Sequence, residues 1–266
     1  MNLPKPAERI VSLIPSITET LFELGLEEKI VGITDYCIKP GHQVDLKEKI
    51  GGPKNPDINK ILDLRPDLII ANIEENREKD VKLLEEKGIG VFVTFPRTVD
   101  ESLELIKTLG DITGSIMKGD QLYKKALEIK NDISDKVVTL KRKPGFVYLI
   151  WRKPYMTVST DTFISNMLEF CGGVNLNKGQ EGQNRYPKLK LEDILHLKPD
   201  IIFLPSEPFN FTEKHISDFS SHKDIPAVKN NRIELVDGEL VSWYGIRMIY
   251  GLPYIWSFIE NYSESN

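Results

Sequence analysis

Aromatic and arginine residues stand at the ends of several predicted strands, where they could bind a ligand. Tyr36 and Trp243 each follow such a strand, and Trp151 and Arg152 end another. Aromatic rings bury a large apolar area against a bound molecule, and guanidinium groups pair with carboxylates. A single aromatic residue is explained by core packing, but several at strand ends together indicate a binding site.

The elements that must position these residues are marked by a phrase that occurs twice. ILDLRPDLIIA begins at Ile61, and ILHLKPDIIFL begins at Ile194, half a chain length later. Each copy has the pattern of an amphipathic helix end, a Pro-Asp break and a short apolar strand. The sequence therefore predicts the same helix-to-strand unit once in each half.

Strands alternate with helices through both halves, a pattern typical of mostly parallel sheets covered on both faces. Between the halves, apolar residues keep three- and four-residue spacing, which indicates one long helix. We therefore expect an α/β protein with an N-terminal lobe at residues 1–114, a linking helix at 115–142 and a C-terminal lobe at 143–266. Ligands of open sheets bind at the carboxyl ends of the strands, so we expect a ligand cleft between the lobes.

Composition excludes several classes of protein. The 266 residues carry a formal net charge of −5 and no basic stripe, which argues against nucleic-acid binding. No apolar run is long enough to span a membrane. If the chain is complete as given, the lack of an apolar N-terminal segment predicts a cytoplasmic protein; if a signal segment was removed, a periplasmic or cell-envelope one. We expect a monomer with two free thiols, at Cys37 and Cys171.

Enzymatic and metal-binding readings find little support in the motifs. No glycine-rich dinucleotide or phosphate loop follows a predicted strand, and no nucleophile elbow is present. The four histidines are scattered and lack the spacing of a metal site. We therefore expect a binding protein that has no catalytic residues and no metal ligands.

Four segments carry a resemblance to a known family: RIVSLIPSITETLFELG, GGPKNPDINKILDLRPDLIIA, TFISNMLEFCGG and RYPKLKLEDILHLKPDIIFL. Together they resemble the helical-backbone (class III) substrate-binding proteins of ABC importers, especially the cobalamin-binding periplasmic branch. The resemblance covers nearly the whole chain. It implies two Rossmann-like lobes bridged by a rigid helix, and capture of cobalamin, an iron-siderophore, haem or, in a further branch, a metal ion.

The cobalamin branch implies a particular set of ligand contacts. Its rim aromatic residues match Tyr36, Trp151, Tyr186 and Trp243 of this sequence. Further expected contacts to the ligand and its amide groups are Gly52, Pro53, Lys54, Asn55, Arg152 and Ser242. The expected ligand is therefore cobalamin or a related corrinoid, held for ABC-type uptake or for intracellular handling.

Arginines support a rival ligand. Four of them lie in or beside predicted cleft segments: Arg97, Arg152, Arg185 and Arg247. Siderophores and haem carry carboxylates that such arginines could bind, whereas cobalamin carries a single phosphate. The alternative reading is therefore a ferric-siderophore or haem binding protein, unless each arginine pairs with an acidic residue of the chain.

The helices before the two Pro-Asp phrases bear on a protein partner. Importer-coupled members of the family resemble one another in an exposed glutamate on each lobe that docks onto the membrane permease. Glu192 matches the second-lobe position, but Asn59 occupies the first-lobe position. A permease contact with two carboxylates would require Asp57 or Asp63 to replace the missing glutamate, so the resemblance alone leaves coupling open.

Overall fold

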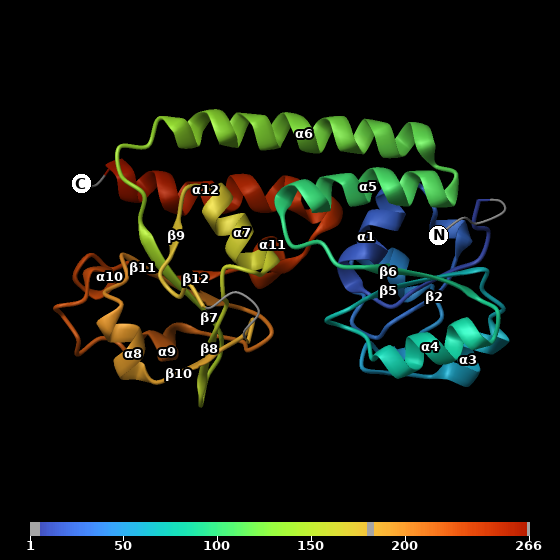
Figure 1. The fold of residues 1–266 in the computed structure, drawn as a ribbon, viewed down its shortest axis with the longest axis horizontal. Helices are drawn as coiled ribbons and strands as arrows, with labels where there is room; N and C mark the ends of the chain where they lie inside the picture. The colour runs from blue at the N-terminus through green and yellow to red at the C-terminus, as the bar shows by residue number, and fades with distance from the viewer. Residues whose placement is uncertain (1–5, 180–183, 265–266) are drawn as a thin grey trace. The chain divides into compact units, whose positions relative to one another are not determined.

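The computed structural model describes residues 6–179 and 184–264, which form two compact units (Figure 1). Unit 1 consists of Met1–Pro96, Asp100–Leu127 and Tyr244–Arg247. Unit 2 consists of Arg97–Val99, Glu128–Trp243 and Met248–Asn266. The chain therefore returns to unit 1 for a few residues after most of unit 2 is complete.

Unit 1 contains a parallel sheet in the order β2-β1-β5-β6. Its strands are β1 (Ile10–Ser12), β2 (Ile30–Ile33), β5 (Leu68–Asn72) and β6 (Gly90–Thr94), and β3 (Gly51–Gly52) pairs with β4 (Asn55–Pro56) in a separate hairpin. The helical segments are α1 (Pro15–Glu23), η1 (Glu27–Lys29), α2 (His42–Asp45), α3 (Ile58–Asp63), α4 (Glu78–Glu86), α5 (Val99–Thr113) and η2 (Gly245–Arg247). Every residue of β5 is buried, which explains its continuous apolar sequence.

Unit 2 contains a sheet in the order β10-β8-β7-β11-β12, with β9 also paired to β7. Its strands are β7 (Gly145–Trp151), β8 (Tyr155–Thr157), β9 (Val174–Asn175), β10 (Lys188–Leu189), β11 (Ile201–Pro205) and β12 (Ile233–Val236). The helices are α7 (Phe163–Phe170), α8 (Leu191–His196), α9 (Glu213–Ile216), α10 (Pro226–Lys229), α11 (Gly238–Ser242) and α12 (Met248–Glu264). The pairs among β7, β9, β11 and β12 are parallel, whereas β8 pairs antiparallel with β7 and β10, so the α/β, mostly parallel prediction is confirmed.

The predicted long helix between the halves is observed as α6 (Ile116–Val138), which contributes residues to both units. Its buried residues Leu122, Ala126 and Ile133 follow the three- and four-residue spacing of the sequence. Gly119, the weakest helix former of this stretch, lies against Gly110 of α5. A Cβ on either glycine would come within 3.1 Å of the other's Cα, so close packing of the two helices explains both residues.

The two copies of the repeated phrase adopt the same local conformation. The C-cap residue of each helix is a leucine, and the next residue, Arg65 or Lys198, has a φ of 47° in the left-handed region. A proline then follows, which prevents the helix from continuing. Left-handed residues at helix ends are usually glycine, so the shared use of a long basic residue confirms that the two phrases are one structural unit.

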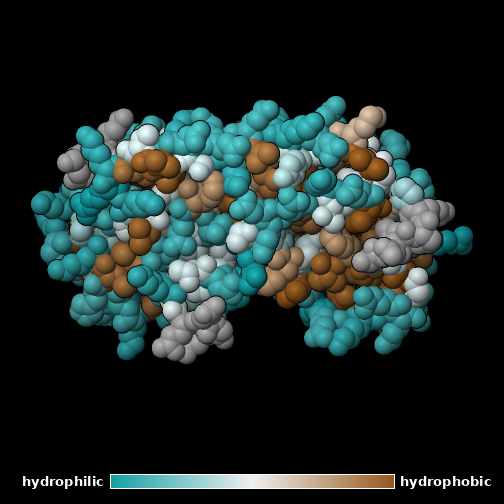
Figure 2. Space-filling view, turned by 45° about the horizontal axis from the view of Figure 1, so that its top comes forward, coloured by the Kyte–Doolittle hydropathy of each residue, from teal (hydrophilic) through white to brown (hydrophobic). Residues whose placement is uncertain are grey.

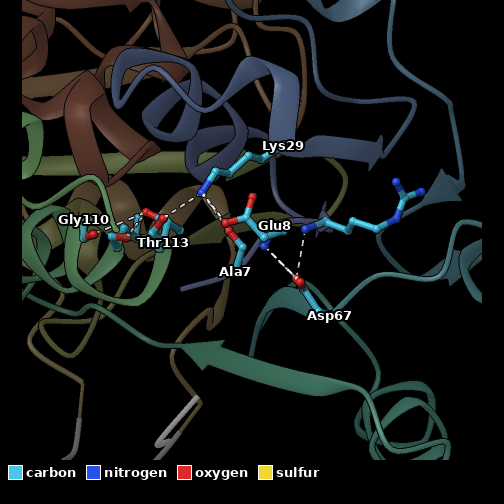
Figure 3. Close-up of polar contacts among 8 residues, drawn as sticks. Ala7, Glu8, Lys29, Asp67, Gly110 and Thr113 are labelled. Carbon is cyan, nitrogen blue, oxygen red and sulfur yellow. Dashed lines mark hydrogen bonds and ion pairs between the residues drawn. The ribbon is translucent and has the colours of Figure 1, made fainter. Parts of the chain in front are cut away.

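The aspartate of each phrase fixes the start of a neighbouring strand. In unit 1 the Asp67 carboxylate accepts hydrogen bonds from the backbone N–H groups of Glu8 and Arg9, at 2.9 and 3.0 Å, as Figure 3 shows for Glu8. In unit 2 the Asp200 carboxylate accepts one from the N–H of Gly145, at 2.8 Å. These aspartates therefore stabilise the fold by binding backbone N–H groups at the start of β1 in unit 1 and of β7 in unit 2.

Candidate functional site

Tyr36 lies just beyond β2, at the carboxyl edge of the unit 1 sheet, and is 65% exposed. Its ring rests against the β3–β4 hairpin, because a Cβ on Gly52 would lie only 3.4 Å from the Tyr36 ring. Ile73, which follows β5 at the same edge, is 61% exposed. Unit 1 therefore presents exposed apolar side chains at the edge where a ligand was predicted.

The hairpin beneath Tyr36 is held by contacts with the loop that follows β5. The Asn76 side-chain amide donates to the carbonyl of Pro53 at 3.0 Å, and the Lys54 ammonium donates to the carbonyl of Glu74. The predicted contacts Gly52, Pro53, Lys54 and Asn55 are therefore brought together with Tyr36. Among these residues, Lys54 and the Pro53 carbonyl already have hydrogen-bond partners within the chain.

A small pocket of about 360 Å³ lies beside Tyr36. Its lining is mixed, with Asp35, His42, Asp45 and Lys49 beside Cys37, Ile38 and Gly41. Within the described residues, no group of three or more His, Cys, Asp or Glu residues is arranged to hold a metal ion. The pocket therefore adds polar character to the unit 1 edge.

Trp151 ends β7 at the carboxyl edge of the unit 2 sheet and is 43% exposed. Its ring meets Phe209 edge-on, with ring centroids 5.6 Å apart, and Phe209 in turn packs against Phe211 and His215. The His215 ring accepts a hydrogen bond from the backbone N–H of Thr212, so it is part of this packing. One side of the Trp151 ring therefore packs against Phe209, and the rest of the ring is partly exposed to solvent.

Arg152, the next residue, is engaged in a side-chain network. Its guanidinium donates two hydrogen bonds to the Asp218 carboxylate, at 2.7 and 2.9 Å, and the Tyr155 hydroxyl donates a third at 2.6 Å. Hydrogen bonding to Arg152 lowers the pKa of Asp218, and burial followed by the Asp218 carboxylate raises the pKa of Tyr155 to about 12. This network holds Arg152 beside Trp151.

Ser242 and Trp243 meet a residue that the sequence analysis did not select, Glu207. The Ser242 hydroxyl and the Trp243 indole N–H both donate to Oε1 of Glu207, at 3.1 and 2.8 Å. Trp243 is only 8% exposed, so it is mostly packed within the protein. Burial raises the pKa of Glu207, although these two hydrogen bonds oppose the change.

The remaining predicted aromatic residue, Tyr186, is half-buried. Its backbone N–H donates to the side chain of Asn184 at 3.1 Å. Tyr186 follows residues 180–183, which are outside the described part of the chain. Its contribution to a ligand site therefore stays a prediction.

The four arginines of the rival reading all have acidic partners. Arg97 and Arg185 both pair with Asp161, at 3.3 and 3.5 Å. Arg247 forms two hydrogen bonds with Glu19, a pair in which each side chain is at most 12% exposed. Together with the Arg152–Asp218 pair, these contacts follow the pattern expected of arginines that serve the fold.

The two predicted permease contacts occupy equivalent, exposed positions. Asn59 is the second residue of α3, and Glu192 is the second residue of α8. Asp57, one possible substitute for the missing glutamate, accepts a hydrogen bond from the Lys60 N–H as the N-cap of α3. Asp63, the other, is exposed at the end of the same helix.

Sequence reasoning missed the residues that organise the unit 2 edge, namely Glu207, Phe209 and Asp218. Glu207 and Phe209 follow β11 closely, so the rule that selected Tyr36 and Trp151 by their position after a strand could have found them. Asp218 lies 66 residues from Arg152 in the sequence, and no local pattern connects the two. Cys37 and Cys171 are free thiols, and both are buried.

Hydrophilic residues cover most of the face drawn in Figure 2, and apolar residues appear there in separate patches. Among the helices of residues 6–179 and 184–264, none combines the length and the apolar character that a membrane crossing requires.

Comparison with known proteins agrees with this architecture. The chain is 31% identical to an uncharacterized ABC transporter substrate-binding lipoprotein, YvrC, of Bacillus subtilis over 95% of this chain and 80% of that protein. It is 30% identical to a vitamin B12-binding protein of Vibrio cholerae over 75% of this chain and 71% of that one.

Solved structures share the fold. The periplasmic vitamin B12 binding protein BtuF of Vibrio cholerae superimposes with a TM-score of 0.86 at 24% identity, covering 97% of this chain and 99% of that one. The periplasmic heme-binding protein RhuT of Roseiflexus sp. RS-1 gives 0.84 at 20% identity, with the same coverage. The model of the family described as "Periplasmic binding protein" matches residues 10–240, so the chain belongs to the periplasmic binding protein family.

Proposed function

We propose that this protein captures a cobalamin-like corrinoid at the carboxyl edges of its two sheets and delivers it to an ABC importer, without altering it chemically. The relatives named for vitamin B12 support the ligand class, and the relative named as an ABC transporter substrate-binding lipoprotein supports the role in uptake. Relatives named as periplasmic proteins or lipoproteins support action in the cell envelope, and nothing among them favours the cytoplasm.

The observation that carries this proposal is the contrast between exposed aromatic side chains and paired arginines. Tyr36 and Trp151 are 65% and 43% exposed, so both still have apolar surface to bury against a ligand. Arg152 and Arg247 are each held by two hydrogen bonds to a carboxylate of the chain. A ligand carboxylate that binds the same edge of either guanidinium would have to displace the carboxylate of the chain.

The size of the aromatic contribution indicates that polar groups must also take part. Fully burying one large apolar side chain contributes about 1.5 to 3 kcal/mol, so Tyr36 and Trp151, which are already partly buried, together contribute less than roughly 3 to 6 kcal/mol. Nanomolar binding requires about 12 kcal/mol. Trp243 adds less than predicted because it is mostly buried already, so hydrogen bonds from the hairpin and the Ser242 region would supply much of the remainder.

Retention of ligand through gel filtration tests the proposal. The purified protein is incubated separately with cyanocobalamin, haemin and ferrichrome, and the absorbance that elutes with the protein is recorded. We expect stoichiometric retention of cobalamin, and its recovery unchanged after denaturation of the protein. Retention of haemin or ferrichrome without cobalamin would overturn the ligand assignment, and recovery of an altered corrinoid would overturn the purely binding role.

One observation favours the second candidate, a haem or ferric-siderophore ligand. Arg97 and Arg185 both pair with Asp161, at 3.3 and 3.5 Å, so two guanidinium groups lie close together in unit 2. A ligand carboxylate would be attracted to two neighbouring guanidinium groups. Under this reading, Arg185→Gln should weaken haemin binding severalfold and leave cobalamin binding unchanged.

For the importer contact, we propose that Glu192 docks onto the permease and that Asn59 makes the unit 1 side of the contact weaker. Both residues are exposed at the same position of their helices, so a carboxylate is present on one unit and absent from the other. Glu192→Gln should weaken binding to the cognate permease in detergent, and Asn59→Glu should strengthen it. Unchanged binding by both variants would contradict docking through these helices.

A further inference from the structure

Glu207 lies at the carboxyl edge of the unit 2 sheet, the same edge at which Trp151 ends β7. Strands β7, β11 and β12 are parallel, with Tyr148 opposite Phe203 and Pro205 opposite Val236, so their carboxyl ends meet at one edge. Glu207 is the second residue after β11, and Trp151 is the last residue of β7. Phe209, two residues beyond Glu207, packs against the Trp151 ring.

The orientation of the Glu207 side chain is fixed from two sides. Oε1 accepts hydrogen bonds from Ser242 and Trp243, at 3.1 and 2.8 Å. Gly238 lies against the stem of the side chain, since a Cβ there would be 2.5 Å from Glu207 Cγ and 2.9 Å from its backbone nitrogen. The carboxylate therefore keeps a defined direction before any ligand arrives, which lowers the entropic cost of binding.

The second carboxylate oxygen is available. Within the described parts of the chain, the hydrogen bonds to this carboxylate all end on Oε1, and Oε2 accepts none. A half-buried carboxylate favours additional donors, because its remaining oxygen has lost part of its hydration. The charges of Asp237 and Glu239 also act on Glu207, which makes this part of the edge acidic.

A buried hydroxyl nearby is also unsatisfied. Tyr148 is 1% exposed, and within residues 6–179 and 184–264 its hydroxyl has no hydrogen-bond partner. Burial raises the pKa of Tyr148, and the charge of Glu207 adds to the change. Unit 2 thus leaves two polar groups incompletely paired among its described residues, the Glu207 carboxylate and the Tyr148 hydroxyl.

We propose that Glu207 is a specificity-determining residue that contacts the ligand through Oε2. The carboxylate accepts hydrogen bonds from amide N–H groups of the ligand and repels ligand carboxylates. The inference rests on the proposed function for the place of the ligand and deepens it, because it selects for amide-bearing corrinoids over corrinoid acids and over haem. Family resemblance did not indicate this residue; its geometry does.

The test compares Glu207→Gln with the wild type and with a matched control, Glu260→Gln. Glutamine keeps an oxygen that can accept from Ser242 and Trp243 but removes the negative charge. Glu260 is an exposed carboxylate of α12, two residues beyond Phe258, whose carbonyl accepts a hydrogen bond from Arg232 just before the amino end of β12. The control therefore lies toward the opposite edge of the sheet.

Affinities are measured by titration for cyanocobalamin, a cyanocobalamin monocarboxylic acid in which one amide is hydrolysed, and haemin. We expect Glu207→Gln to bind cyanocobalamin about tenfold more weakly, the effect of losing one charge-assisted hydrogen bond. The preference for cyanocobalamin over its acid should fall, whereas Glu260→Gln should match the wild type. An unchanged preference would overturn the inference, including the case in which both affinities fall equally.

Failure of the proposed function would look different. If the wild type binds haemin and no corrinoid, the ligand assignment fails, and the Glu207 inference is then tested on haemin alone. The variant should bind haemin severalfold more tightly, because one like charge near the haem carboxylates is removed. Equal haemin affinity of the variant and the wild type would overturn the inference in that case as well.

Discussion

Tyr244 in unit 1 and Tyr148 in unit 2 are both buried tyrosines, but their hydroxyl groups have different surroundings. The Tyr244 hydroxyl lies 3.4 Å from the Thr94 hydroxyl and also forms hydrogen bonds with Ser16 and Asn72. The Tyr148 hydroxyl has no partner within the described residues. Two carboxylates differ in the same way: the buried Glu19 pairs through both oxygens with Arg247, whereas within the described residues the half-buried Glu207 accepts hydrogen bonds through one oxygen.

This difference indicates what each set of polar groups does. Buried polar groups that are fully paired stabilise a unique fold, and a group left unpaired usually has a functional reason or an unseen partner. We infer that the Glu19–Arg247 group is structural and that the polar groups around Glu207 serve ligand binding. Four predictions test this comparison, from the largest expected effect to the smallest.

Breaking the unit 1 pair should have the largest effect. Arg247→Met leaves Glu19, whose side chain is 9% exposed, without its charged partner, and should lower the free energy of unfolding by about 3–5 kcal/mol. Urea unfolding at neutral pH measures the loss. The loss should shrink at mildly acidic pH, because burial already raises the pKa of Glu19 and its protonated form needs no counter-charge. The control Lys60→Met, at the exposed pair with Glu48, should cost at most about 1 kcal/mol.

Truncating the exposed aromatic of unit 2 should affect binding more than stability. Trp151→Ala removes a half-exposed ring and should weaken cobalamin binding at least about tenfold, equivalent to 1.5–3 kcal/mol of burial. Equilibrium titration measures the affinity, and Tyr123→Ala on α6 serves as the aromatic control. A full-affinity Trp151→Ala variant would remove this residue from the site.

The Arg152–Asp218 pair should contribute less to stability than the Glu19–Arg247 pair because it is more exposed. It still contributes, because the Asp218 carboxylate accepts two hydrogen bonds from Arg152 and one from Tyr155. Asp218→Asn should cost about 1–3 kcal/mol at neutral pH. Pairing lowers the pKa of Asp218 below 3.8, so its stabilisation is present above 3.8 and is lost as the pH falls through the lower folded-state value. Denaturation curves of the variant and the wild type should therefore converge in acid; a constant difference would contradict the pairing. Asp132→Asn, at the exposed pair with Lys136, should change little at any pH.

The sharpest test of the comparison removes one hydroxyl from each unit. Tyr244→Phe should lower the free energy of unfolding by about 0.5–1.5 kcal/mol, because its hydrogen-bond partners lose their donor or acceptor. Tyr148→Phe should be neutral or slightly stabilising, because no partner is lost. Thermal denaturation of the two variants measures the difference, and a clear destabilisation by Tyr148→Phe would show that its hydroxyl is satisfied after all.

Local patterns predicted much of this molecule. Alternation of strands and helices gave the α/β class, and the spacing of Leu122, Ala126 and Ile133 gave the long helix. Position after a strand selected Tyr36 and Trp151 as candidate ligand contacts; their rings are exposed, and their contact with a ligand stays a prediction.

What the sequence could not supply was pairing between distant side chains. Trp243 follows the same rule as Trp151 but is buried, because its indole N–H reaches Glu207, 36 residues away. The sequence predicts that Arg152 contacts a ligand, but it does not show that the Asp218 carboxylate accepts a hydrogen bond from this arginine. Such pairs depend on where whole elements pack, and residue spacing along one element carries no information about them.

The equivalent aspartates of the two repeated phrases also make local opening of each unit measurable by hydrogen exchange. The amide protons of Glu8 and Arg9 are held by Asp67, and that of Gly145 is held by Asp200. Each can exchange with solvent deuterium only when the strand start separates from its aspartate. Comparing the protection factors of Arg9 and Gly145 would therefore show which strand start opens more readily, and whether ligand makes opening of both less frequent.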